Sequence, residues 1–306
     1  MKSRIVAILA IALAGAACGG GCPASLDWDA APSIGRGMKY IHLTLDEPRL
    51  MENYLVRIDL RTPGLHATST GRASNWGAVM TDYTNEVYVI DTLRVRTRAF
   101  LEEHRAHGTN MVLALNTSPW GPWRPPFNHK HGRFASLVVS DGRIVSHARR
   151  RNGMLVILTN NVAMITSQLD DALIPSVAIA HPGHGFGIIM QGGKSLVAPR
   201  RPDQKPSLAP RTAFGLSADG RWLYGVVVDG RQPGYSEGAD GDDLVRIMKA
   251  AGAADAINMD GGGSSTFAWW NEGTQSVLIP NRHDAAYRRY RPVAMNLGFY
   301  FDEQGN

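Results

Sequence analysis

The chain has 306 residues, of which 44 % are hydrophobic, and this composition is sufficient for a sizeable buried core. Its formal net charge of +5 suits an anionic substrate, whereas the lack of a dense basic run argues against nucleic-acid binding. Only two cysteines are present, Cys18 and Cys22, which excludes a disulfide framework and a thiolate metal site from the rest of the chain.

The N-terminus has the features of an export signal. A basic start is followed by an apolar run at 5–13 and by small residues at 14–17. The apolar run is too short to span a bilayer as a stable helix. Cys18 comes directly after the small residues, as in a bacterial lipoprotein attachment site, and plain secretion is the alternative. We predict a signal peptide at 1–17 and a lipid-anchored protein of the bacterial cell envelope.

The segment after the signal is rich in Gly, Pro, Ala and Asp, and we interpret residues 18–37 as a tether to the membrane. A single domain at 38–306 is expected to follow. Within it, alternation of apolar and polar residues predicts a strand at 54–60, and another strand begins near 65–69. Apolar residues at helical spacing predict a helix over 92–107.

A short apolar run at 111–115 predicts a buried strand that ends at Asn116. The loop that follows contains Trp120 and Trp123 next to polar residues. Aromatic faces pack on the C–H surfaces of sugars, so this composition favours a carbohydrate site. A Pro-rich surface loop that is anchored by its aromatic residues is the alternative.

Two hairpins are predicted in the middle of the chain. Strands at 136–140 and 143–147 flank Asp141-Gly142, which is a strong turn signal, and strands at 154–158 and 162–165 form the second pair.

Two pairs of histidines lie close in sequence, His129 with His131 and His181 with His184. Neither pair has a third ligand at a spacing known from metal sites, so we interpret them as ordinary loop histidines. No metal and no cofactor are predicted.

The last third of the chain has the clearest pattern. Strands are predicted at 212–217 and 221–229. Asp240 is a suitable N-cap for a helix whose apolar residues recur at helical spacing, and Gly252 is a suitable C-cap. A short buried strand is then expected at 256–259.

Two aspartates follow these strands, and both are candidates for chemistry. Asp229 ends one strand and Asp260 follows another, so neighbouring strand ends would place two carboxylates around one cleft. Either acid could instead cap a turn.

Three glycines at 261–263 and three hydroxyl residues at 264–266 come directly after Asp260. Glycines let the backbone adopt positive φ angles and let a ligand approach closely. Successive backbone N–H groups in such a turn can form a nest for an anion. A tight turn whose hydroxyls cap the next segment is the alternative. The segment does not match a phosphate-binding P-loop, because the lysine of that motif is absent.

Five short motifs together resemble the phosphodiester glycosidase family. They are RTA at 211–213, VDGR at 228–231, GYSEG at 234–238, NMDGGGSST at 258–266 and RPVA at 291–294. The resemblance is strongest over 205–300. After Asn116 the family usually continues with glycine and aromatic residues, whereas this chain continues with Thr-Ser-Pro-Trp.

The resemblance implies an α/β (α+β) fold, with one mixed β-sheet flanked by helices in a single domain. It also implies a hydrolase that cleaves a sugar-1-phosphodiester at the anomeric C–O bond, for example in an N-acetylglucosamine-1-phosphodiester or an envelope glycan. A departing phosphate monoester, with a second pKa of about 6, is a good leaving group, so one carboxylate plus donors to the phosphate is sufficient.

The candidate catalytic residues, in order of preference, are Asp260, Glu237 and Asp229. Asp260 has the most fixed backbone position, whereas Glu237 lies on a loop that is free to close over a substrate. The candidate substrate-binding residues are Asn116, Trp120, Arg211, Ser236, Asn258, Gly261, Gly262, Gly263, Ser264, Ser265, Thr266 and Arg291.

Two other classes of function fit the same residues. A non-catalytic lipoprotein of the envelope would bind glycan through the tryptophans and hydroxyls and would need no exposed carboxylate. A metal-dependent phosphodiesterase would cut the P–O bond, with Asp229, Asp260, Asn258 and histidines as ligands. The expected partners are a carbohydrate phosphodiester and, through Cys18, a membrane; no nucleic acid is expected.

We predict that Cys18→Ser moves the protein from the membrane to the soluble exported fraction, because acyl chains would supply the anchor. Fractionation of cells that express the wild type and the variant measures this. A wild type that is already soluble would show that Cys18 carries no lipid.

Overall fold

The computed structural model of the chain describes residues 16–17, 20–83, 85–123, 128–147, 153–170, 173, 175–181, 187–282 and 290–302. Most of the predicted signal peptide, and Cys18, lie outside these residues. Within the described ranges, no helix has both the length and the apolar character needed to cross a membrane.

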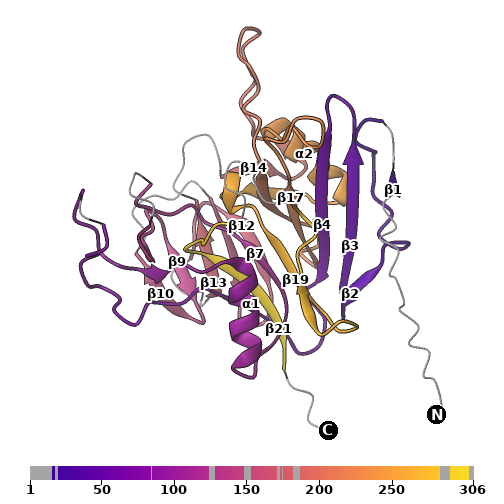
Figure 1. Cartoon of the computed structure of the whole chain (residues 1–306). Coiled ribbons are helices and arrows are strands. Elements are labelled where there is room, and N and C mark those ends of the chain that lie inside the picture. The colour runs from indigo at the N-terminus through magenta and orange to yellow at the C-terminus, as the bar shows by residue number, and fades with distance from the viewer. Residues whose placement is uncertain are drawn as a thin grey trace, which may run out of the picture.

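The largest sheet has nine strands (Figure 1). Its order is β1-β3-β4-β17-β16-β18-β14-β15, and β2 pairs with β3 outside this path. The strands are β1 (Ala16–Ala17), β2 (Ser33–Gly35), β3 (Met38–Leu45), β4 (Met51–Asp59), β14 (Ile188–Gln191), β15 (Lys194–Ser195), β16 (Arg211–Leu216), β17 (Trp222–Val228) and β18 (Asp255–Asn258).

Two five-stranded sheets and one two-stranded sheet complete the β structure of the described residues. The orders are β20-β19-β7-β21-β5, β10-β9-β13-β11-β12 and β6-β8. The strands are β5 (Leu65–Ser69), β6 (Thr92–Leu93), β7 (Asn110–Asn116), β8 (His131–Gly132), β9 (Val138–Ser140), β10 (Arg143–Ser146), β11 (Met154–Leu158), β12 (Ala163–Thr166), β13 (Pro175–Ala180), β19 (Phe267–Asn271), β20 (Ser276–Leu278) and β21 (Asn296–Phe301).

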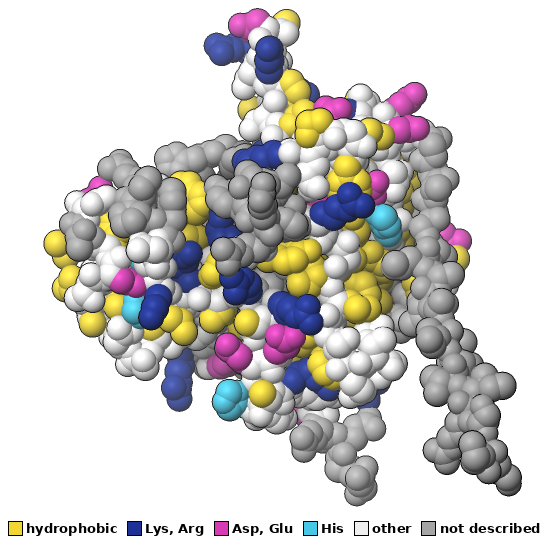
Figure 2. Space-filling view, in the orientation of Figure 1, with side chains coloured by type: hydrophobic (Ala, Val, Ile, Leu, Met, Phe, Trp, Pro, Cys, Tyr) yellow, Lys and Arg dark blue, Asp and Glu magenta, His cyan; other side chains and the backbone are white. Residues whose placement is uncertain are grey.

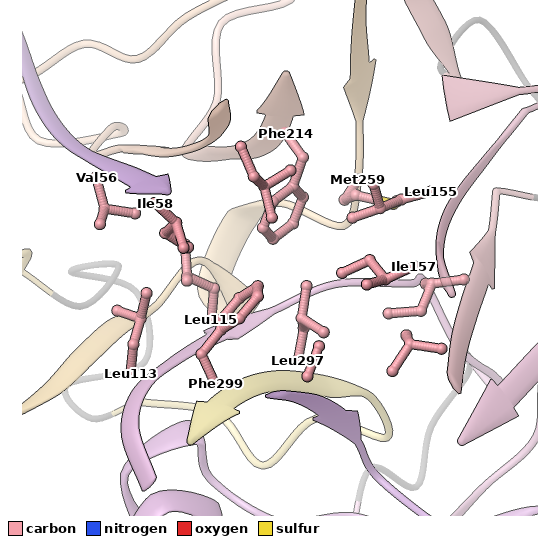
Figure 3. Close-up of a cluster of buried hydrophobic side chains, with 14 of the residues drawn as sticks. Val56, Ile58, Leu113, Leu115, Leu155, Ile157, Phe214, Met259, Leu297 and Phe299 are labelled. Atoms are coloured by element: carbon pink, nitrogen blue, oxygen red, sulfur yellow. The ribbon is translucent and has the colours of Figure 1, made fainter. Parts of the chain in front are cut away.

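One hydrophobic core joins the three larger sheets. Figure 3 shows Val56 and Phe214 of the nine-stranded sheet facing Leu115 and Phe299 of the sheet around β7, with Leu155 of the third sheet beside them. All five side chains are almost completely buried. Burial of one such side chain contributes roughly 1.5–3 kcal/mol, so the shared core stabilises all three sheets together.

Two helices cover outer faces of these sheets. Helix α2 (Gly241–Ala251) packs on the nine-stranded sheet, and α1 (Thr97–Ala106) packs on the sheet around β7. The predicted caps of α2 are confirmed: the carboxylate of Asp240 accepts from the N–H of Asp243 at 3.0 Å, and Gly252 has a φ of 99°. A side chain rarely adopts such a φ, so glycine ends the helix here.

The predicted helix over 92–107 is wrong at its start. Thr92–Leu93 is strand β6, which pairs with β8 across the chain, and α1 begins only at Thr97. Pairing with residues nearly forty positions away overrides the local helical spacing.

The predicted mixed sheet flanked by helices overstates both the mixing and the helices. Among the described strands, only β1 with β3 is a parallel pair, and all other paired strands are antiparallel. Antiparallel neighbours can be joined by short hairpins, whereas parallel strands need long crossovers that are often helical. The fold is therefore an α+β fold that consists mostly of β-sheet.

The structure also differs from the tether predicted at 18–37. Trp28 is 5 % exposed, and its indole N–H donates to the carbonyl of Ala251 at 2.9 Å. The N–H of Leu26 donates to the carbonyl of Ala250 at 2.8 Å, and β2 pairs with β3. The part of this segment from Leu26 onward is therefore packed against the domain.

Trp28→Ala should lower the free energy of unfolding by about 3–5 kcal/mol, because it removes a buried aromatic ring and leaves a cavity. Trp123→Ala, at a ring that is 52 % exposed, is the matched control and should cost far less. Urea denaturation of the two variants measures the difference. Equal stabilities would mean that the N-terminal segment contributes nothing to the folded domain.

Candidate active site

The two predicted aspartates lie close to the ends of neighbouring strands inside the nine-stranded sheet. Strand β16 lies between β17 and β18 and is antiparallel to both, so β17 and β18 run in the same direction. Asp229 follows the end of β17, and Asp260 comes two residues after the end of β18. Arg211 is the first residue of β16 and lies at the same end of these strands.

Asn116 fixes the loop around Asp260 to the second sheet. It is fully buried at the end of β7. Its side-chain amide donates to the carbonyl of Asp260 at 3.0 Å, and its side-chain carbonyl accepts from the hydroxyl of Thr212 at 2.7 Å and the N–H of Thr266 at 2.9 Å. Asn116 is thus a structural residue beneath the site.

The glycine turn differs from the predicted anion nest. The N–H of Gly261 donates to the carboxylate of Asp260 at 2.9 Å, and the N–H of Gly262 donates to the carbonyl of Pro210 at 2.8 Å. These two donors are therefore not directed at a ligand. Glycine is still required, because Gly262 has a φ of 64° and a Cβ on Gly261 would lie 2.5 Å from the carbonyl oxygen of Pro210.

Asp260 is half-buried and has a perturbed carboxyl group. Burial raises its pKa to about 6, while a hydrogen bond from Ser264, the positive charge of Arg291 and the N–H of Gly261 act in the opposite direction. The guanidinium of Arg291 is 3.4 Å from the hydroxyl of Ser264. Hydrogen bonds thus connect the carboxyl group of Asp260, the hydroxyl of Ser264 and the guanidinium of Arg291 in one row.

Asp229 is buried and enclosed by donors. Burial raises its pKa to about 6, and hydrogen bonds from the N–H of Arg282, from Asn281, from Tyr235 and from Tyr54 oppose this effect. The Arg282 N–H lies 2.8 Å from one carboxylate oxygen, and the Tyr235 hydroxyl lies 3.2 Å from the same oxygen. The hydroxyls of Tyr54 and Tyr235 are 2.6 Å apart, so the carboxylate ends a short chain of hydrogen bonds.

Asn281 connects the surroundings of the two aspartates. Its side-chain N–H₂ group donates to Asp229 at 3.3 Å and to the carbonyl of Ser265 at 3.1 Å, while its side-chain carbonyl accepts from the N–H of Phe267 at 3.0 Å. No recognised motif contains Asn281, Tyr54 or Arg282, so none of them was a candidate from the sequence. Tyr235 lies in the GYSEG motif, which was the one available signal.

Several other predicted site residues serve the structure. The guanidinium of Arg211 donates to the carbonyls of Ala239 at 3.0 Å and Ser207 at 2.6 Å. Burial and the nearby Arg231 lower its pKa to about 10, so it remains a cation at neutral pH. The hydroxyl of Ser236 donates to the backbone carbonyl of Asp229 at 2.7 Å.

Glu237 lies apart from the two aspartates. Its side chain is exposed, and its backbone N–H donates to the carbonyl of Leu50 at 2.9 Å. Among the described residues, no hydrogen bond or ion pair joins its carboxylate to the Asp229 or Asp260 groups.

The hydroxyl residues and Asn258 are buried behind the turn. The Thr266 hydroxyl donates to the carbonyl of Ser264 at 3.1 Å. The Asn258 amide and the Ser265 hydroxyl are buried and make no hydrogen bond within the described structure.

A cavity of about 630 Å³ lies next to Arg291. It is lined by Leu93, Arg94, Arg96, Trp120, Trp123, Asn128, His129, Lys130, Tyr290, Arg291 and Pro292. We call it the basic aromatic pocket. It contains both tryptophans of the predicted sugar-binding loop, although Trp120 is buried and only Trp123 is well exposed.

A metal site needs several His, Cys, Asp or Glu side chains placed close together. The described residues contain no group of three or more such side chains that could hold a metal ion. His129 instead contacts the carbonyl of His131 and the guanidinium of Arg94. His184 lies outside the described residues.

One family model and several solved structures are similar to this chain. The family model for phosphodiester glycosidases matches residues 125–300, which is more than half of the chain. The catalytic domain of zebrafish N-acetylglucosamine-1-phosphodiester α-N-acetylglucosaminidase, auto-inhibited by its pro-peptide, is a similar solved structure. It matches with a TM-score of 0.57 and 16 % identity over 90 % of this chain and 87 % of that chain.

Two further solved structures are similar. A hypothetical protein from Synechocystis matches with a TM-score of 0.56 and 12 % identity, over 89 % of this chain and 64 % of that chain. A protein from Burkholderia pseudomallei that is described as exported matches with a TM-score of 0.53 and 15 % identity, over 83 % of this chain and 74 % of that chain. At these identities the likeness shows the fold. No curated protein sequence matches the chain.

The contribution of Asp229 to the free energy of unfolding should decrease as the pH rises from about 4 to about 7. Its pKa is raised from 3.8 to about 6, so folding favours the protonated form, and this stabilisation is lost as the pH passes through about 6. The loss corresponds to at most about 3 kcal/mol.

Urea denaturation of the wild type and of Asp229→Asn at both pH values isolates this contribution, because the amide does not titrate. The variant should lose less stability than the wild type over this range. Identical losses would show that the Asp229 carboxyl titrates normally in the folded protein.

Proposed function

The chain belongs to the phosphodiester glycosidase family and is a glycosidase-type hydrolase, and from this premise we propose that it cleaves a sugar-1-phosphodiester at the anomeric C–O bond. The observation that supports this proposal most is the row formed by Asp260, Ser264 and Arg291. It combines one carboxyl group for the sugar carbon with a cation for the phosphate, and the buried hydroxyl of Ser264 connects the two.

In the proposed reaction, the bond between the anomeric carbon and the bridging oxygen breaks, and that oxygen leaves with the phosphate. Water supplies the new oxygen on the sugar. Asp260 either removes a proton from this water or attacks the anomeric carbon itself and is then released by water. The leaving phosphate monoester has a second pKa of about 6, so it needs little help from a general acid.

Arg291 resolves an electrostatic conflict in this site. A carboxylate next to a phosphodiester would repel it, but a guanidinium that stabilises the ionised form of Asp260 also attracts the phosphate. In this proposal the phosphate lies on the Arg291 and Ser264 side of Asp260, and the sugar carbon lies on the other side.

The three candidate acids differ in their surroundings, and these favour Asp260. Asp229 already accepts hydrogen bonds from several donors, and we propose that it holds the Tyr235 and Asn281 segments in place. Glu237 is exposed and separate from this network. The proposed order is therefore Asp260, then Asp229, then Glu237, which reverses the last two positions of the order derived from the sequence.

We also propose that the protein acts outside the cytoplasm, as a membrane-anchored lipoprotein of the cell envelope with a carbohydrate phosphodiester as its substrate. The support is the signal-like N-terminus followed by Cys18.

The test is incubation of the purified protein with an N-acetylglucosamine-1-phosphodiester in ¹⁸O-labelled water. Cleavage of the C–O bond places the label on the sugar. A label on the phosphate, or loss of activity with a chelator, would indicate a metal-dependent phosphodiesterase instead. Binding without turnover would indicate a glycan-binding protein.

Asp260→Asn should fold and bind substrate but lose at least about a hundredfold in turnover, because the amide cannot act as base or nucleophile. Glu237→Gln changes the charge in the same way at an exposed position and should lose little. Turnover and thermal stability are measured for both. Near-normal turnover in Asp260→Asn, together with a large loss in Glu237→Gln, would assign the chemistry to Glu237.

A further inference from the structure

The basic aromatic pocket has more positive charge than one phosphodiester needs. Arg94, Arg96, Lys130 and Arg291 line it, and none of the described residues that line it is acidic. A phosphodiester carries a single negative charge. Figure 2 shows Lys and Arg side chains spread over one face of the molecule, with hydrophobic and acidic side chains between them.

Arginine and tryptophan are stacked in two pairs at this pocket. The guanidinium carbon of Arg94 lies 4.3 Å from the ring centre of Trp120, and that of Arg291 lies 4.6 Å from the ring centre of Trp123. The two rings meet edge to face at 5.3 Å. Stacking occupies the flat face of a guanidinium, and its N–H groups, which point outward from the edge, can still donate to a phosphate.

No described acidic side chain forms an ion pair with Arg94, although the charge of Asp82 acts on it. One of its terminal nitrogens donates to the carbonyl of His129 at 2.6 Å, whereas its Nε is buried and has no hydrogen-bond partner in the described structure. Burial and the nearby Arg291 lower its pKa to about 10, so it is charged at neutral pH. Asp82 itself accepts a hydrogen bond from the N–H of Lys130 and contacts His131. A partly buried cation is costly unless its charge is compensated, and an anion in the pocket, which Arg94 lines, would compensate it.

The pocket continues from the proposed catalytic site. Arg291 lines it and also reaches Ser264, which is hydrogen-bonded to Asp260. The phosphate next to Asp260 would engage Arg291, and the group attached to that phosphate would extend toward Arg94, Arg96 and Lys130.

We propose that the basic aromatic pocket binds the group that leaves with the phosphate, and that this group carries a second phosphate. This inference rests on the proposed function. The corresponding substrate is a sugar-1-phosphodiester whose other arm is itself phosphorylated, as in a polymer whose units are joined by phosphodiesters.

Binding is tested first, without turnover. Isothermal titration calorimetry of the purified protein uses glycerol 3-phosphate as the ligand and glycerol as the neutral comparison. The wild type should bind glycerol 3-phosphate and not glycerol. Arg94→Gln should weaken this binding at least tenfold, which is about 1.4 kcal/mol. Arg98→Gln removes the same charge from the exposed face of α1, where Arg98 pairs with Glu102, and should change binding less than twofold.

Lys130→Gln is a second variant in case Arg94→Gln fails to fold, since Lys130 is exposed. It should weaken binding of glycerol 3-phosphate severalfold. Absence of binding in the wild type would overturn the proposal, as would equal binding in the wild type, Arg94→Gln and Lys130→Gln.

Kinetics then separate this proposal from the proposed function. Two substrates are compared, the N-acetylglucosamine-1-phosphodiester of methanol and that of glycerol 3-phosphate. The wild type should have at least a tenfold lower KM for the second substrate, and Arg94→Gln should abolish most of this preference. Hydrolysis of both with equal KM would overturn the pocket proposal and leave the proposed function intact. Binding of glycerol 3-phosphate that depends on Arg94, without hydrolysis of either substrate, would support the phosphate site and overturn the proposed function.

Discussion

The side chain of Asn116 is the interaction on which the candidate site depends. One buried amide joins the end of β7, the start of β16 and the loop after β18, and these segments belong to two different sheets. A buried amide that makes three hydrogen bonds allows little freedom, because each bond that is lost leaves a polar group without water. The backbone of Asp260 is therefore fixed in relation to both sheets at once.

The topology explains why two aspartates far apart in sequence belong to one site. Because β16 is antiparallel to both neighbours, β17 and β18 run in the same direction and end on the same side of the sheet. The residues that follow these two strand ends have different surroundings. Asp229 is surrounded by tyrosine hydroxyls and Asn281, and Asp260 by Ser264 and Arg291. Burial raises both pKa values to about 6. Arg291 connects Asp260 to the basic aromatic pocket, whereas Asp229 is linked to this pocket through Asn281 and Tyr290.

Features with local causes could be predicted from the sequence. The cap residues of α2 lie directly before and after the helix in the sequence. The hairpin turn at Asp141-Gly142 has the expected positive φ angles of 47° and 71°. Strand ends at Asn116, Asp229 and Asp260 were also visible, because short apolar runs precede them. The family motifs added Arg291 to the candidate residues.

The errors come from contacts that the sequence does not show. The glycine turn was expected to present its N–H groups to a ligand, but Pro210, some fifty residues earlier, accepts one of them. The backbone N–H of Glu237 donates to the distant carbonyl of Leu50, and Asn281 joins the site from a loop without any recognisable pattern. Such contacts depend on tertiary packing, which overrides local preferences.

The position of β21 has a consequence for how this chain reaches its native state. This strand is the last one of the described chain, yet it lies inside its sheet, between β7 and β5, so that Leu65–Ser69 pairs only with residues more than 220 positions later. Proteins with many such distant pairings fold slowly, because a long loop must close before any contact compensates for the lost entropy. The sheet around β7 cannot close while the C-terminal strand is still being synthesised. Folding of this domain is therefore expected to be largely a late event rather than one that proceeds stepwise from the N-terminus.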